Sequence, residues 1–144
     1  MFSVRQDDVL RALKKSMRLA KQDFLAGPLT EDPPYWKAQA EARRQVYAEL
    51  AKEVSEYGVE AAYRRASRSY AALPLFDLEG QDGDARPDPV LLGREQAYEM
   101  FFSIIGVPEM KLLHLRNSRR RKRTSAGSRV HLDPGDKARA GLSV

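Results

Sequence analysis

The chain has 144 residues and a formal net charge of +5; 42% of its residues are hydrophobic, 31% are charged and none is cysteine. This length suits one domain, and the missing cysteines exclude disulfides, thiolate metal sites and a cysteine nucleophile. No apolar run approaches the roughly 18 residues of a membrane span, and the charged N-terminal segment lacks the apolar stretch of a signal peptide, so we expect a cytoplasmic protein that makes no membrane contact.

The first predicted helix covers about residues 4–26. Apolar side chains recur there at spacings of three and four, as expected for one buried helix face. Ser3 and Gln6 form a capping-box pattern at its start. Gly27, which is followed by proline, marks its end.

Two further helices are predicted on either side of Gly58, a natural helix stop. The segment 33–57 has an apolar stripe, and Asp32 is placed to cap its N-terminus. The segment 59–73 has a second stripe, and Pro74 ends it because proline cannot continue a helix.

An acidic loop, about residues 76–89, interrupts the helical periodicity. A strongly apolar helix over 94–105 and a short helix over 108–116 follow it. No segment shows the alternation that a strand needs. The sequence therefore predicts an all-α bundle of four or five helices over residues 3–115, followed by a basic, disordered C-terminal tail over 116–144.

The helix over 94–105 is apolar around well over half of its circumference, which is typical of a helix at the centre of a core or at an interface. Together with the apolar residues after it, this helix offers more apolar surface than a small monomer needs to bury. One hypothesis is therefore a homo-oligomer or a larger protein complex that forms through residues 97–115. The candidate interface residues are Tyr98, Phe101, Phe102, Ile105 and Leu113.

The positive charge is concentrated near the C-terminal end of the sequence. Residues 116–144 hold nine Lys or Arg and two Asp, a net charge of +7. Residues 1–115 hold 16 basic and 18 acidic residues, a net charge of −2. This asymmetry predicts an acidic partner for the tail rather than for the helical body.

Five consecutive basic residues, Arg119–Arg123, dominate this tail, and we call them the basic run. A flexible polycation is attracted to phosphate because binding releases condensed counterions. We therefore expect a nucleic acid, DNA or RNA, as the partner, with a protein contact and a solubilising role as alternatives. The candidate phosphate-binding residues of the tail are Arg116, Arg119, Arg120, Arg121, Lys122 and Arg123.

Cations on the first and third predicted helices are further candidates for phosphate contacts. On the third helix, helical geometry places the arginines opposite the apolar stripe, facing solvent. A helix-turn-helix has a similar outline, but its glycine turn is missing after Arg65, so a helical hairpin with a charged exterior is the favoured interpretation. The candidates are Arg64, Arg65 and Arg68 together with Lys14, Lys15 and Arg18.

Residues that could carry catalysis or bind a metal are sparse. The two histidines, His114 and His131, match no zinc-binding spacing, and nucleophile and phosphate-loop motifs are missing. A calcium loop that starts at Asp77 fails because its sixth position is Asp82, where glycine is required. We therefore expect neither an enzyme nor a cofactor, a metal ion or a small-molecule substrate.

Overall fold

The computed structural model describes residues 2–75 and 86–119. Within these ranges every regular element is a helix, which confirms the all-α prediction. The elements in chain order are α1 (Gln6–Leu25), the short 3-10 helix η1 (Gly27–Leu29), α2 (Pro33–Tyr57), α3 (Val59–Ala72), α4 (Pro89–Ile105) and a last helix over residues 109–119, which we call the terminal helix.

The first three helices end within two residues of their predicted bounds, whereas the last two differ more. Helix α4 begins five residues before the predicted start at 94, because Asp88 caps it and Pro89 fits its first turn. The Asp88 side chain accepts hydrogen bonds from the backbone N–H groups of Val90 and Leu91. The terminal helix continues to residue 119, beyond the predicted end at 116.

Parts of two predictions lie outside the described residues. The proposed acidic loop covered 76–89, of which 76–85 are not described, and its last residue is already the first of α4. The predicted disordered tail covered 116–144. Residues 116–119 are helical, and residues 120–144 lie outside the described part.

Two predicted N-terminal caps are wrong in detail. Helix α1 starts at Gln6 with Arg5 as its N-cap residue, so Ser3 lies too early to cap it. Asp32 does occupy the N-cap position of α2, but its side chain accepts no capping hydrogen bond. The Asp32 carboxylate pairs instead with the Arg86 guanidinium, which also lies over the Tyr35 ring.

Glycine ends two helices by adopting a backbone conformation that other residues rarely take. Gly58 has φ 92° and is the single residue between α2 and α3, so the chain turns there without a loop. Gly106 has φ 83° and ends α4 in a left-handed conformation. The Val107 N–H then bonds back to the Phe102 carbonyl oxygen, which completes a C-terminal cap.

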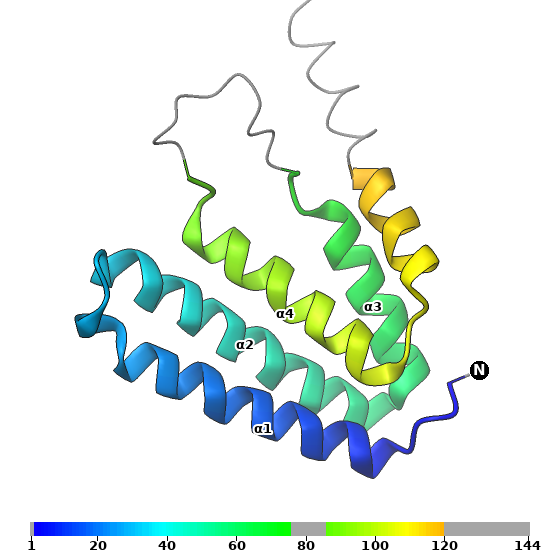
Figure 1. Cartoon of the computed structure of the whole chain (residues 1–144). Helices are drawn as coiled ribbons and strands as arrows, with labels where there is room; N and C mark the ends of the chain where they lie inside the picture. The colour runs from blue at the N-terminus through cyan, green and yellow to red at the C-terminus, as the bar shows by residue number, and fades with distance from the viewer. Residues whose placement is uncertain (1, 76–85, 120–144) are drawn as a thin grey trace, which may run out of the picture.

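Helix α2 is at the centre of the arrangement (Figure 1). It packs against α1 on one side and α4 on the other, and its C-terminal part also contacts α3. Helices α1 and α2 run in opposite directions, whereas α2 and α4 run in similar directions (Figure 1). Helix α3 and the terminal helix lie together near the C-terminal half of α4 and end at the same side of the molecule (Figure 1).

The core forms where the apolar faces of these helices meet. Leu13 of α1, Val54 of α2 and Tyr70 of α3 are fully buried, as are Phe101 and Phe102 of α4. Helix α4 therefore has apolar residues around most of its circumference because it is packed on several sides. Of the helices in the described ranges, none combines the length and the apolar character that crossing a membrane requires.

Helices α2 and α4 approach each other closely at Gly93. A Cβ atom added there would lie 2.4 Å from the Gln39 carbonyl oxygen and 2.9 Å from the Ala42 Cβ atom. Both positions are on α2, whose backbone cannot move away without disturbing its packing against α1. The lack of a side chain at residue 93 therefore sets the distance between the two helices.

We expect the substitution Gly93→Ala to destabilise the fold. Overpacking a tight contact costs about 1–3 kcal/mol, which exceeds the gain of about 1 kcal/mol from the higher helix propensity of alanine. The free energy of unfolding, measured by urea denaturation, should fall by up to about 2 kcal/mol. The neighbouring exposed substitution Arg94→Ala is the control and should change it by less than about 0.5 kcal/mol. An increase in stability for Gly93→Ala would show that the helices are further apart than described.

Candidate functional site

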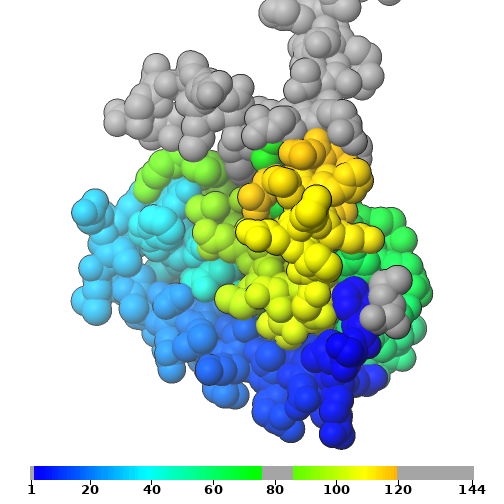
Figure 2. Space-filling view, turned by 45° about the vertical axis from the view of Figure 1, so that its right-hand side comes forward, coloured from blue at the N-terminus to red at the C-terminus, as the bar shows by residue number. Residues whose placement is uncertain are grey.

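The terminal helix brings two arginines of the predicted tail against the bundle. Arg116 and Arg119 are three residues apart and so share one face of this helix. Glu95 and Glu99 are four residues apart and share one face of α4. The surface of the terminal helix lies over the molecule between α3 and α4 (yellow to orange in Figure 2).

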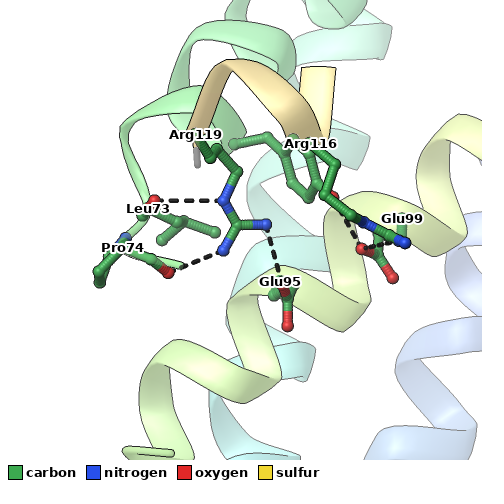
Figure 3. Close-up of polar contacts among 7 residues, drawn as sticks. Leu73, Pro74, Glu95, Glu99, Arg116 and Arg119 are labelled. Carbon is green, nitrogen blue, oxygen red and sulfur yellow. Dashed lines mark hydrogen bonds and ion pairs between the residues drawn. The ribbon is translucent and has the colours of Figure 1, made fainter. Parts of the chain in front are cut away.

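Arg119 is buried, with only 1% of its surface exposed. Its Nε and Nη2 atoms donate to the carbonyl oxygens of Leu73 (3.2 Å) and Pro74 (2.8 Å), which follow α3, and its Nη1 donates to the Glu95 carboxylate on α4 (2.8 Å) (Figure 3). The guanidinium also lies 4.7 Å from the centre of the Tyr70 ring. The Arg119 side chain therefore links the terminal helix to α4 and to the residues that follow α3.

Arg116 makes a second, more exposed connection to the same helices. Its Nη2 donates to the Glu99 carboxylate at 2.7 Å, and its Nε lies 3.4 Å from the Tyr70 hydroxyl oxygen (Figure 3). The Tyr70 hydroxyl in turn donates to the same Glu99 oxygen at 2.8 Å. Tyr70 thus contacts Arg116 through its hydroxyl and Arg119 through its ring. We call these five residues the arginine clamp: Tyr70, Glu95, Glu99, Arg116 and Arg119.

The clamp matches each buried charge with an opposite one. Its members perturb one another: the Tyr70 hydroxyl and the Glu99 carboxylate raise the pKa of Arg116 further above its ordinary value. Burial is the main cause that raises the pKa of Tyr70. Arg119 also places a positive charge at the C-terminal end of α3, where the helix dipole favours cations.

The clamp changes the interpretation of the basic run. Arg119 is its first residue, yet its guanidinium is used inside the fold and is closed to solvent. Residues 1–119 hold 18 basic and 18 acidic residues and are neutral in sum. Residues 120–144 hold seven basic and two acidic residues, so the whole net charge of +5 belongs to the chain after the clamp.

The three arginines predicted on α3 are exposed, and two of them have acidic neighbours. Arg64 lies 3.8 Å from Glu60. Arg65 lies 3.9 Å from Glu53, and its guanidinium is 4.6 Å from the centre of the Tyr57 ring. Such exposed pairs are weak and exchange easily with other partners. Arg68 is exposed and has no carboxylate within ion-pair distance in the part of the chain that the structure describes.

The predicted cations of α1 form a separate group. Lys14, Lys15 and Arg18 are all exposed, and none forms an ion pair with another described residue. Helix α2 packs against both α1 and α3, whereas α1 and α3 make little direct contact. The structure therefore does not gather the cations of α1 and those of α3 into one compact cluster.

Four of the five candidate interface residues lie in the core. Tyr98, Phe101, Phe102 and Ile105 are at most 5% exposed, because α4 is packed on several sides. Only the fifth, Leu113 on the terminal helix, is exposed, together with Met110 one turn before it. These two side chains line a surface groove of about 340 Å³.

A second hollow of about 390 Å³ lies where the C-terminal end of α1 meets the N-terminal part of α2, and Trp36 and Gln96 are among its lining residues. Several polar side chains that line this hollow are hydrogen-bonded to one another: Gln39 donates to Gln96, and Arg43 donates to Gln39 and to Asp23. Within residues 2–75 and 86–119, no group of three or more acidic or histidine side chains is arranged to hold a metal ion.

The remaining residues considered for metal chemistry are not part of such an arrangement. His114 is exposed on the terminal helix. His131 and the start of the tested calcium loop lie outside the described residues.

Comparison with protein-family models, curated proteins and solved structures finds no match. The function is therefore inferred from charge and geometry. Sequence reasoning missed Tyr70, Glu95 and Glu99 as members of a site. A usable signal was present, since the Glu95–Glu99 and Arg116–Arg119 spacings each place two like charges on one helix face.

We expect Arg119→Ala to be strongly destabilising. The substitution leaves the carbonyl oxygens of Leu73 and Pro74 and the carboxylate of Glu95 without their partner. Removing one member of a buried ion pair costs about 3–5 kcal/mol, and the partial exposure of Glu95 reduces this to about 2–4 kcal/mol. Urea unfolding measures the loss. The control Arg68→Ala removes an exposed arginine, and an equal effect of both substitutions would contradict the clamp.

Alkaline pH is expected to weaken the fold through Tyr70. Tyrosine in the unfolded chain loses its proton near pH 10, whereas buried Tyr70, whose pKa is raised, keeps it to higher pH. The unfolded state then binds fewer protons, so the free energy of unfolding falls as the pH rises above about 9. In Tyr70→Phe this fall should be shallower between about pH 9 and 11.

Urea unfolding at a series of pH values measures this slope. Tyr57→Phe is the matched control, because it removes the hydroxyl of a tyrosine that is 55% exposed. A wild-type slope in Tyr70→Phe would mean that this hydroxyl is in contact with water.

Proposed function

We propose that this protein is a non-catalytic, nucleic-acid-binding accessory protein whose main phosphate contacts come from residues Arg120–Arg123. The exposed cations of α3 and α1 assist. On α3, Arg68 is the first of them because, unlike Arg64 and Arg65, it has no carboxylate within ion-pair distance among the described residues. Arg119, the first residue of the run, is buried among its clamp partners and therefore does not contact phosphate.

The observation that carries the proposal is the separation of charge at residue 119. A neutral folded body is followed directly by four adjacent cations, Arg120–Arg123. A folded body whose net charge is zero exerts no overall electrostatic attraction on a polyanion. A short, dense cationic segment attracts a polyanion strongly, because each neutralised phosphate releases counterions.

The composition of the run also indicates how the nucleic acid is contacted. Residues 116–129 contain no aromatic side chain, so this segment has no platform on which bases could stack. Contacts to phosphate carry no sequence information by themselves. We therefore expect binding that depends strongly on salt and weakly on base sequence.

A second candidate function, a protein–protein contact through the terminal helix, is favoured by one observation. Met110 is 81% exposed and Leu113 is 53% exposed, and they lie beside the same groove. Light scattering over a range of concentrations tests self-association through this surface. A mass that stays monomeric, and that Leu113→Ser does not alter, would remove a homo-oligomer from consideration.

The nucleic-acid proposal predicts a definite salt dependence. Binding to double-stranded DNA through four cations should give a plot of log affinity against log salt with a slope of about −3.6. A protein that ends at Arg119 keeps the clamp and should lose most of this salt-sensitive binding. Fluorescence anisotropy with labelled single- and double-stranded DNA and RNA, at low and high salt, measures both quantities.

The control retains residues 120–144 and replaces only the four cations Arg120–Arg123 with glutamine. It should behave like the protein that ends at Arg119, because charge rather than length drives binding. If the shortened protein binds all four nucleic acids as tightly as the intact chain, the basic run is not the binding segment and the proposal fails.

A further inference from the structure

We propose that the hollow of about 390 Å³ at the meeting point of α1, α2 and α4 binds a nucleobase, with Trp36 as the stacking surface and with Asp23 and Gln96 as hydrogen-bonding partners on opposite walls. The base comes either from a free nucleoside or from an unpaired position of a single strand. This inference goes beyond the proposed function and does not depend on the basic run, since all the residues that line the hollow belong to the folded body.

The hollow lies where three helices meet at one side of the molecule. The C-terminal end of α1 and the N-terminal halves of α2 and α4 are found there (left in Figure 1). Its volume of about 390 Å³ falls within the range of small-ligand sites, roughly 300–1,000 Å³. The space therefore suits a small ligand such as one base with its sugar.

A row of hydrogen-bonded side chains crosses the hollow from α1 to α4. The Arg43 guanidinium donates to the Asp23 carboxylate at 2.7 Å and to the Gln39 amide oxygen at 3.2 Å. The Gln39 amide nitrogen then donates to Gln96. Gln39 is only 5% exposed, so the middle of the row is fixed by burial. Asp23 on α1 and Gln96 on α4 are its two ends.

Each end of the row keeps one hydrogen-bonding group for a ligand. Asp23 uses its Oδ2 atom for Arg43, and its Oδ1 atom accepts no hydrogen bond from another described residue. Gln96 uses its Oε1 atom for Gln39, and its Nε2 group donates to no side chain or backbone within the described ranges. Both residues are exposed, so the hollow offers an acceptor on one wall and a donor on the other.

The charges of the hollow cancel. Asp23 and Arg43 neutralise each other at 2.7 Å, and the other residues that line the space carry no charge. A phosphate group would therefore gain little here. An apolar ligand would separate the polar row from water without replacing its hydrogen bonds, which is unfavourable. The ligand that fits is uncharged and has hydrogen-bonding groups of its own.

Trp36 adds an aromatic surface to this polar site. It is the one tryptophan of the chain and is 38% exposed. The Tyr35 ring packs edge-on against it, with ring centres 4.9 Å apart, and the Tyr35 hydroxyl donates to the Pro87 carbonyl oxygen at 2.7 Å. Every base has a face that stacks on such a ring. A nucleobase combines this face with a donor and an acceptor on its edges and is uncharged at neutral pH.

The fluorescence of Trp36 tests the proposal directly, because no other tryptophan contributes to the signal. Adenosine added to the intact protein should quench this fluorescence along a saturable curve, with a midpoint of about 0.1–5 mM, as expected for so small a ligand. Ribose, which lacks the base, should cause no change. A parallel titration of N-acetyltryptophanamide corrects for light absorption and collisional quenching by adenosine.

A matched pair of substitutions tests the donor on α4. Gln96→Glu keeps the oxygen that accepts from Gln39 and removes the amide N–H donor. The affinity for adenosine should fall by about three- to tenfold, because one hydrogen bond to the ligand is lost. Gln45→Glu adds the same charge at an exposed residue nine positions after Trp36, on the opposite face of α2, and should leave the affinity unchanged. Circular dichroism verifies that both variants are folded.

A second ligand tests the acceptor on α1. Purine riboside lacks only the amino group of adenosine, so the intact protein should bind it about three- to tenfold more weakly. In Asp23→Ala this difference between the two ligands should disappear, whereas the exposed control Glu31→Ala should preserve it. Loosening of Arg43 would weaken both ligands equally, so the loss of the difference requires that Asp23 contacts the amino group.

Strands without bases identify the source of the ligand. A strand of abasic sugar–phosphate units that carries one adenine should quench Trp36 at a lower concentration than adenosine does if the site takes bases from a polymer. The fully abasic strand is the control and should not quench. Quenching by adenosine, with none by the strand that carries one adenine, assigns the site to free nucleosides.

Failure of this inference is separate from failure of the proposed function. If adenosine, guanosine, cytidine and uridine all leave Trp36 fluorescence without a saturable change, the hollow binds no base and the inference is overturned, whatever the basic run does. Equal quenching by ribose overturns it as well, since the site would then recognise a sugar. Saturable quenching by a nucleoside in a protein without salt-dependent DNA binding would remove the proposed function and leave this inference in place.

Discussion

The position of the terminal helix depends on one buried guanidinium, that of Arg119. Apolar packing alone holds this helix weakly, since Leu112 and Leu115 are only partly buried and Met110 and Leu113 face solvent. The guanidinium adds three hydrogen bonds, an ion pair with Glu95 and a contact with an aromatic ring. Such a group stabilises the structure only when all its partners are present, because each partner left alone is a buried polar group without a hydrogen bond.

Most helix bounds could be predicted because they depend on local chemistry. Gly58 and Gly106 end helices through a backbone conformation that glycine adopts most readily. A glycine after an apolar helical stripe therefore predicts the end of a helix from the sequence alone. The start of α4 was missed because Asp88 and Pro89 resemble a loop, although the same pair forms an N-cap and a first helical turn. The cap at Ser3 was wrong because α1 begins at Gln6, with Arg5 as its N-cap residue, two residues after Ser3.

The candidate site was harder to predict because its contacts join residues that are distant in sequence. Arg119 is followed by four more basic residues, and only the packing of the terminal helix against α3 and α4 distinguishes it from them. The apolar character of α4 was equally ambiguous: a central core helix and an interface helix have the same composition. In the structure, Phe101 and Phe102 are buried against other helices of the same chain, so α4 is a core helix at these positions.

The clamp also has a consequence for the order in which the protein is made. Synthesis proceeds from the N-terminus, so Tyr70, Leu73, Pro74 and Glu95 all leave the ribosome before Arg119 does. Helices α1 to α4 can assemble around their shared core while the groove that receives the terminal helix is still open. Docking of the terminal helix then follows the assembly of α1 to α4, because Arg119 is synthesised after every residue that it contacts.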